Sequence, residues 1–193
     1  MSLPLILAST SPYRKQLLER LGIAFTTASP AVDESRLSGE PPEAMVRRLS
    51  EAKARAVAAQ HPNALIIGSD QMAVCGEEVL GKPGSHENAT AQLARLSGKR
   101  VTFLTGLCLH NSATGHMQLE VAPFHVVFRT LDASMIENYL KREHPYNCAG
   151  SFKSEGLGTA LFERLEGDDP TALIGLPLIR LTRMLEKEGI RVI

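Results

Sequence analysis

The chain has 193 residues, of which 44% are hydrophobic and 22% charged, so it can bury the core of one domain, or of one domain with two lobes. Its 21 basic residues balance its 21 acidic residues, and this zero formal charge argues against a protein that grips long nucleic acid. No segment approaches the roughly 20 apolar residues that span a bilayer, so we expect no membrane partner.

The N-terminal part alternates strands with helices: in chain order we expect a strand at residues 3–8, a helix at 12–21, a strand at 24–28 and a helix at 42–60. Ser11 is a good N-cap for the first helix, and Pro12 suits its first position, where a missing N–H leaves nothing unpaired. In the second helix Met45, Leu49 and Ala52 recur at helical spacing, which indicates one buried face.

Strands dominate the rest of the chain. We expect a buried strand at 65–68 ending at Ser69-Asp70-Gln71, then a small hairpin of 72–74 with 78–80, a helix at 86–96 and long strands at 101–110 and 117–129. After these we expect a helix at 133–142, an irregular segment at 148–158 and a helix at 172–188. The two long strands flank a turn-rich segment, residues 111–115, which favours a hairpin. Strands that alternate with helices, plus a long hairpin, predict an α/β fold with a mixed sheet, and we expect a single domain over residues 1–193.

Several signatures of common enzyme classes are absent from the chain. It contains no GxxxxGK[ST] phosphate loop, no GxGxxG after a strand, no HExxH and no GxSxG. Its six histidines show no metal-ligand spacing. P-loop enzymes, dinucleotide-binding enzymes, zinc proteases and serine hydrolases are therefore unsupported.

Polar residues gather where strands are expected to end, which is where α/β proteins place ligands. The turn Ser9-Thr10-Ser11 offers hydroxyls and free N–H groups to an anion, and Arg14 can clamp phosphate oxygens. Ordinary helix capping by Ser11 explains part of the same pattern.

Three more polar clusters carry charge. Asp33-Glu34 lies in the loop after the second strand, and Lys53 lies on the second helix; each alone is more typical of a solvated surface. Asp70 is the strongest candidate, because it follows a hydrophobic strand and a charge there is costly unless a cation balances it. Lys82, beyond the small hairpin, is expected to return to the same cleft.

Three widely spaced cysteines, Cys75, Cys108 and Cys148, form neither a CxxC pair nor an even disulfide set. We expect them to be reduced and structural. The first residues lack the basic flank, long apolar run and cleavage site of a signal peptide. These features predict a cytoplasmic protein.

In combination and order, the clusters resemble the Maf family of nucleoside triphosphate pyrophosphatases. The matching segments are ILASTSPYR at 6–14, VDE at 32–34, the helix around Lys53, IIGSDQ at 66–71, GKP at 81–83, TGL at 105–107 and AGSFKSEG at 149–156. The resemblance implies an elongated mixed sheet in two lobes around a cleft, and metal-dependent release of pyrophosphate from a nucleotide.

By matching position, the resemblance makes Asp70 the catalytic carboxylate. It assigns the substrate phosphates to Ser9, Arg14, Lys53 and Lys82, and a divalent cation, Mg²⁺ or Mn²⁺, to Asp70 and Glu34. Water would attack the α-phosphorus, with Asp70 as general base or as metal ligand. Both roles remain open at this point.

Three positions that vary within the family imply a substrate branch. The branch that acts on dTTP and UTP carries Arg, Thr and Gln where this chain has Tyr13, Gln71 and Glu155, a combination that resembles the 7-methyl-GTP pyrophosphatase branch. A carboxylate at Glu155 can accept both donors of guanine, and Tyr13 can stack on the cationic methylated base. The simpler alternative is that Tyr13 packs on its helix and Glu155 is solvated.

The sequence is also compatible with other functions. The chain can act on other damaged purine triphosphates, or on dTTP and UTP, or it can be a non-catalytic nucleotide-binding regulator of cell division. The sequence is compatible with a homodimer, although no interface can be read from it.

Overall fold

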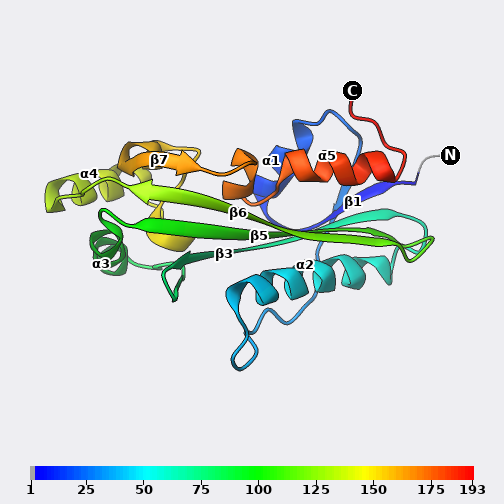
Figure 1. The fold of residues 1–193 in the computed structure, drawn as a ribbon, viewed down its shortest axis with the longest axis horizontal. Helices are drawn as coiled ribbons and strands as arrows, with labels where there is room; N and C mark the ends of the chain where they lie inside the picture. The colour runs from blue at the N-terminus through cyan, green and yellow to red at the C-terminus, as the bar shows by residue number, and fades with distance from the viewer. Residues whose placement is uncertain (1–2) are drawn as a thin grey trace. The chain divides into compact units, whose positions relative to one another are not determined.

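A seven-stranded mixed sheet runs through the structure, a computed structural model that describes residues 3–193 (Figure 1). The strands follow the order β2-β1-β3-β5-β6-β7, and β4 pairs with β3. Pairing is parallel for β1 with β2 and with β3, and antiparallel for β3 with β4 and for β6 with β7. The predicted α/β fold with a mixed sheet is confirmed.

The chain divides into two compact units. Unit 1 holds the residues up to 71 together with 104–122 and 169–193, and unit 2 holds 72–103 and 123–168. Three strands contribute residues to both units: β3 (Leu65–Cys75), β5 (Arg100–Asn111) and β6 (Met117–Phe128). The prediction of a single domain over the whole chain is not decided by this division.

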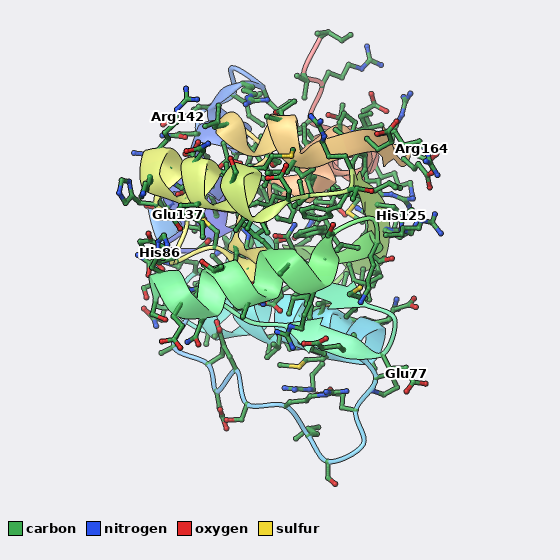
Figure 2. The ribbon with its side chains drawn as sticks, turned by 90° about the vertical axis from the view of Figure 1, so that its left-hand side faces the viewer. Glu77, His86, His125, Glu137, Arg142 and Arg164 are labelled. Atoms are coloured by element: carbon green, nitrogen blue, oxygen red, sulfur yellow. The ribbon has the colours of Figure 1, made fainter. Side chains whose placement is uncertain are left out.

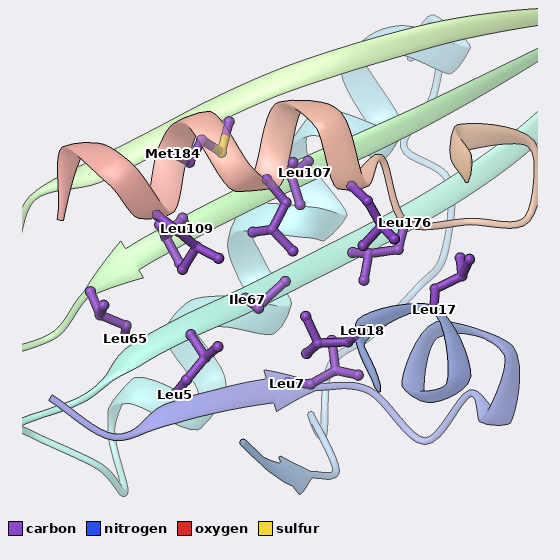
Figure 3. Close-up of a cluster of buried hydrophobic side chains, with 13 residues drawn as sticks. Leu5, Leu7, Leu17, Leu18, Leu65, Ile67, Leu107, Leu109, Leu176 and Met184 are labelled. Atoms are coloured by element: carbon purple, nitrogen blue, oxygen red, sulfur yellow. The ribbon is translucent and has the colours of Figure 1, made fainter. Parts of the chain in front are cut away.

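The sheet of unit 1 is buried on both faces. β1 (Leu5–Ala8) sends Leu5 and Leu7 into a cluster with α1 (Pro12–Glu19) and α5 (Leu178–Lys187), shown in Figure 3. Its alternate residues, Ile6 and Ala8, pack instead with α2 (Pro42–Ala58). The two-residue period of a strand therefore sorts each side chain to the α1/α5 face or to the α2 face, which lie on opposite sides of β1 (Figure 1).

The approach of α2 to the sheet requires two glycines. A Cβ at Gly68 of β3 would lie 2.1 Å from the carbonyl oxygen of Ser50, and one at Gly106 of β5 would lie 2.3 Å from the Ser50 hydroxyl. Only residues without a side chain permit backbone contact at that distance. The two glycines thus set how close the residues of α2 come to β3 and β5.

Unit 2 has its own core and its own helices. Phe103, Phe128, Phe152 and Phe162 meet edge to face, with ring centroids 5.1–5.6 Å apart. The unit also contains β4 (Glu78–Leu80), α3 (His86–Leu96), α4 (Ala133–Glu143), two 3₁₀ turns (Ala149–Ser151 and Leu157–Leu161) and β7 (Phe162–Glu166). The short strand β2 (Thr26–Ala28) and the 3₁₀ turn Pro170–Leu173 belong to unit 1.

Two expectations about the elements were wrong, and one strand was missed. The strand predicted to end at Asp70 continues to Cys75, so Asp70 lies in the middle of β3. The last helix begins at Leu178 and not near residue 172, because Gly175 has a φ of +118° and Pro177 precedes the helix. Strand β7 was not expected, since its sequence FERLE carries three charges and lies at the sheet edge.

Candidate active site

One lysine holds two of the predicted carboxylates. The Nζ of Lys53 lies 2.6 Å from Asp70 Oδ1 and 2.8 Å from Glu34 Oε1. The side chains of Lys53 and Asp70 are 6% and 12% exposed, whereas that of Glu34 is 60% exposed. The structure therefore brings together three residues that the sequence placed in separate clusters, as a buried ion pair with a second, accessible carboxylate.

The fold explains why Asp70 meets Lys53. Ile66, Gly68 and Asp70 alternate along β3 onto the α2 face, where Ile66 packs. The Ser50 hydroxyl accepts a hydrogen bond from the Asp70 backbone N–H at 2.9 Å and donates to the Val46 carbonyl at 2.6 Å. The cost of burying the Asp70 charge in the middle of a strand is thus offset, because the carboxylate pairs with the Lys53 ammonium of the neighbouring helix.

Ser9 and Arg14 occupy the predicted turn between β1 and α1. The Ser9 hydroxyl is buried and accepts a hydrogen bond from the Ser11 N–H at 3.1 Å. Ser11 caps α1 by accepting from the Arg14 N–H, as expected. The Arg14 Nε donates to the Gly175 carbonyl at 2.9 Å, which leaves its terminal nitrogens for an anion.

The guanidinium of Arg14 interacts electrostatically with both carboxylates, Asp70 and Glu34. Burial lowers the pKa of Arg14, and the negative charges of Asp70 and Glu34 oppose that shift. The guanidinium stays protonated, because an arginine pKa is far above neutrality. Arg14 thus adds a fixed positive charge near Asp70.

The two specificity positions of unit 1 differ in their surroundings. Tyr13 is 39% exposed and therefore accessible to a ligand. The Gln71 amide nitrogen donates to the Ala172 carbonyl at 2.7 Å, with longer contacts to Thr105 Oγ1 and the Leu173 carbonyl. Because its donors are used in this way, Gln71 holds the 172–173 backbone in place rather than presenting an amide N–H to solvent.

Lys82 and Glu155 belong to unit 2, and both are exposed. The backbone around Lys82 is tied down, since the Gly84 N–H donates to the Tyr146 carbonyl and Gln92 donates to the Gly81 carbonyl. Lys82 makes no ion pair with the part of the chain from residue 3 onward. That Lys82 and Glu155 line the same cleft as Asp70 stays a prediction of the sequence.

Glu143 shapes the segment that carries Glu155. Its carboxylate accepts from the Leu157 N–H at 2.7 Å and lies 3.4 Å from the Lys153 ammonium. A Cβ at Gly158 would lie 2.2 Å from the Lys153 carbonyl oxygen, a backbone atom, so the turn requires glycine at that position. This glycine of the predicted irregular segment thus has a structural cause.

Another charged contact in unit 2 joins its two helices. His86 of α3 and Glu137 of α4 lie side by side in Figure 2, with Nε2 and Oε2 at 2.8 Å, while His86 Nδ1 lies 2.9 Å from the Tyr146 hydroxyl. Both side chains are about half-exposed, and the contact ties the Tyr146 loop to the two helices. We assign it a structural role.

Sequence reasoning missed several residues that build the site. Ser50 carries no signal beyond its residue type, because its importance comes from helix-to-strand contact. Ser69 is buried and donates to the carbonyls of Gly106 and Gly175, which joins β3 to β5 and to the loop before α5. The motif glycine of TGL and the serine of GSD were clues, but their partners lie far away in sequence.

The donor set is suited to a hard divalent cation. Among residues 3–193 no group of three or more His, Cys, Asp and Glu side chains gathers in metal-binding geometry. Mg²⁺, however, is commonly held by one or two carboxylates together with substrate phosphates. Glu34 and Asp70 each contact the Lys53 ammonium through one oxygen, so each carboxylate has a second oxygen to offer a cation. With Arg14 nearby the two carboxylates and two cations sum to zero formal charge, so the fit rests on the oxygen donors and not on net charge. Such a pair fits a cation.

Burial makes Cys108 unsuited to act as a nucleophile. All three are free thiols, and burial raises the pKa of Cys108 to about 12. A thiol that holds its proton so firmly is a poor nucleophile.

None of the helices described is both long and apolar enough to cross a membrane.

Comparisons with known proteins bear on the whole chain. Residues 4–188 match the sequence profile of the Maf-like proteins. A protein named 7-methyl-GTP pyrophosphatase from Alcanivorax borkumensis is 59% identical over 97% of this chain and 95% of its own length. A protein of the same name from Pseudomonas putida is 58% identical over 98% of this chain and 99% of its own. The Ham1 protein of Staphylococcus aureus, at 12% identity and a TM-score of 0.53, covers 96% of this chain and 99% of its own and shares the fold.

Proposed function

The chain belongs to the Maf-like protein family, and from that premise we propose that it is a pyrophosphatase that hydrolyses 7-methyl-GTP to 7-methyl-GMP and diphosphate. Such an activity keeps a modified nucleotide out of nucleic acids. The observation that carries the proposal is the group formed by Glu34, Lys53 and Asp70, two carboxylates on one buried lysine.

The residues of unit 1 provide the charges that this reaction needs. Water attacks the α-phosphorus, the bond to the bridging oxygen breaks, and pyrophosphate leaves with the bonding electrons. Negative charge therefore grows on phosphate oxygens, and Arg14 and Lys53 are cations that can balance it. The buried Ser9 hydroxyl can turn its proton toward a phosphate oxygen, because it accepts rather than donates in its hydrogen bond with the Ser11 N–H.

Asp70 is the group we assign to the attacking water. Its Oδ1 is bound to Lys53, and Oδ2 remains to accept a proton or to contact a cation. When bound at Asp70 and Glu34, Mg²⁺ or Mn²⁺ would supply Lewis-acid stabilisation of the phosphates. Lys53 holds the two carboxylates at a shared point before any ligand arrives.

The choice of base rests on Tyr13 and Glu155. Guanine presents a ring N–H and an amine on one edge, which one carboxylate can accept together. Methylation at N7 makes the base cationic, so that stacking on Tyr13 gains roughly 0.5–2 kcal/mol from the cation–π interaction. Uracil and thymine flank their N–H with two carbonyls, which Glu155 would repel.

We expect the purified protein to convert 7-methyl-GTP to 7-methyl-GMP and pyrophosphate in equal amounts. Its kcat/KM should exceed that for GTP and, more clearly, those for dTTP and UTP. Two base contacts worth about 1–2 kcal/mol each correspond to a preference of roughly ten- to several-hundred-fold. Chromatography of the products and a kcat/KM series over the four nucleotides make the test.

Two variants serve as controls for that selectivity. Tyr13→Ala should narrow the gap between 7-methyl-GTP and GTP, and Glu155→Gln should weaken discrimination against UTP. Equal rates on 7-methyl-GTP and UTP would refute the substrate assignment, and release of orthophosphate with a nucleoside diphosphate would refute the bond assignment. Tight nucleotide binding without any product would favour the non-catalytic regulator.

Removal of metal should abolish activity without unfolding the protein. EDTA is expected to stop pyrophosphate release, and excess Mg²⁺ or Mn²⁺ should restore it. The Tm should change by no more than about 2 °C, because Lys53 already neutralises one carboxylate and Glu34 is exposed. Activity that persists in EDTA would count against a divalent cofactor.

We place the enzyme in the cytoplasm, where free nucleotides are made and where its three reduced cysteines are stable. Its partner is a small nucleotide rather than long nucleic acid. The homodimer that the sequence allows stays a prediction.

A further inference from the structure

Glu34 lies in a segment that has no helix or strand of its own. Residues 33–41, which we name the acidic loop, connect the region after β2 to the start of α2. Glu34 is mostly exposed, and its contact with Lys53 is a single ion pair. An exposed carboxylate on such a loop would normally sample many positions, so its placement beside Asp70 calls for a physical cause.

The other end of the acidic loop carries a buried carboxylate. Glu40 is only 9% exposed, and its two oxygens receive the Arg48 guanidinium as a fork, at 2.6 Å from Nε and 2.7 Å from Nη2. The Leu37 N–H donates to the same carboxylate at 3.1 Å. The hydrogen bonds from Arg48 are the largest cause that holds the pKa of Glu40 at about 2, so the carboxylate is charged at any pH used for assay.

Arg48 also holds the loop next to Glu34. Its Nη2 donates to the Ser35 carbonyl at 3.0 Å, one residue after Glu34. A second arginine, Arg36, donates to the Glu40 carbonyl through Nε and Nη2, which closes the loop upon itself. One guanidinium therefore fixes both ends of the segment 35–40.

The helix α2 carries both Arg48 and Lys53. The guanidinium that holds the loop and the ammonium that receives Glu34 thus lie on one rigid element. A bidentate arginine–carboxylate pair fixes direction as well as distance, which a lysine cannot do. The arrangement sets the position of Glu34 relative to Lys53, and through Lys53 relative to Asp70.

We propose that Arg48 and Glu40 are positioning residues that hold the acidic loop so that Glu34 is preorganised beside Lys53 and Asp70. Neither residue touches the reacting atoms, and both act through Glu34. The inference rests on the proposed function for its catalytic consequence, whereas the ordering of the loop does not depend on any activity.

The first test measures loop order without substrate or metal. Arg48→Gln should raise hydrogen exchange of the hydrogen-bonded backbone amides of Leu37 and Glu40 by about tenfold or more, while the β3 amides keep their protection. The matched control is Arg47→Gln, which removes the same charge from the exposed neighbouring position on α2. Unchanged exchange of the loop in Arg48→Gln, or an equal rise in both variants, would overturn the proposal.

The second test asks whether Arg48 acts through Glu34. Loss of a partner that orients a metal-binding group typically costs about 10–100-fold in metal affinity or activity, so Arg48→Gln should need about 10–100-fold more Mg²⁺ for half-maximal pyrophosphate release. In the Glu34→Gln background the same change should cost less than about threefold, because the residue it positions is already gone. Arg48→Lys should recover only part of the loss.

Equal costs of Arg48→Gln in the wild-type and Glu34→Gln backgrounds would overturn the positioning role. If the wild-type protein releases no pyrophosphate, the proposed function fails. The hydrogen-exchange experiment still decides whether the Arg48–Glu40 pair orders the acidic loop. The two failures are thereby distinguished.

Discussion

Asp70→Asn is expected to lower kcat for pyrophosphate release by at least about 10²-fold, the lower range for loss of a general base. The substitution keeps the size of the side chain, and its carbonyl oxygen can still accept a hydrogen bond from Lys53. The backbone bond from residue 70 to Ser50 is unaffected, so β3 and α2 should keep their contact. The change therefore removes the charge and the basicity of Asp70 while the surrounding structure remains.

The decisive measurements for this variant are kcat, Mg²⁺ dependence and the thermal melt. If Asp70 acts mainly as a metal ligand, high Mg²⁺ should recover part of the lost rate; if it acts mainly as a base, kcat should stay low at every Mg²⁺ concentration. Asp168→Asn makes the same chemical change at an exposed position and should leave kcat near the wild-type value. An Asp70→Asn enzyme with more than about half of the wild-type rate would move the catalytic role elsewhere, first to Glu34.

Much of the fold could be predicted from local patterns. Ser11 and Pro12 mark the start of α1, and the apolar spacing of Met45 and Leu49 marks α2, because capping and periodicity act within a few residues. The start of α5 was missed, although the glycine at 175 and the proline at 177 are local signals for it. Asp169 adds a contact that no local pattern shows, because it accepts hydrogen bonds from the N–H groups of Thr171 and Ile179 and so joins the turn at 171 to the start of the helix.

The candidate site was predictable in its members but not in its contacts. The family resemblance assigned Glu34, Lys53 and Asp70 to one site, yet no pattern in the sequence indicated that Lys53 would bridge the two carboxylates. That contact depends on the alternation of β3 and on the depth at which α2 packs, which are tertiary properties. For the same reason Arg48 and Glu40 gave no signal, since a charged pair eight residues apart is usually solvated.

Gly68→Ala is expected to lower the free energy of unfolding by more than about 3 kcal/mol, at or above the usual cost of overpacking. The added Cβ would lie 2.1 Å from the Ser50 carbonyl oxygen and 2.9 Å from the Ala54 N–H nitrogen. Both are backbone atoms of α2, so no change of rotamer relieves the clash and the helix itself must move. For a chain of this size the loss corresponds to a fall in Tm of roughly 6–12 °C.

The activity of the same variant should fall further than its stability alone explains. A shift of α2 carries Lys53 away from Asp70, and a misplacement of about 1 Å can cost about 10²-fold in rate. The assay should therefore be run well below the lowered Tm, where the variant is folded. Gly81→Ala adds the same methyl group where no atom lies within 4 Å, and its Tm should match that of the wild type. A Gly68→Ala variant with the Tm and kcat of the wild type would contradict this account. It would show that the contact between α2 and β3 does not set the distance between Lys53 and Asp70.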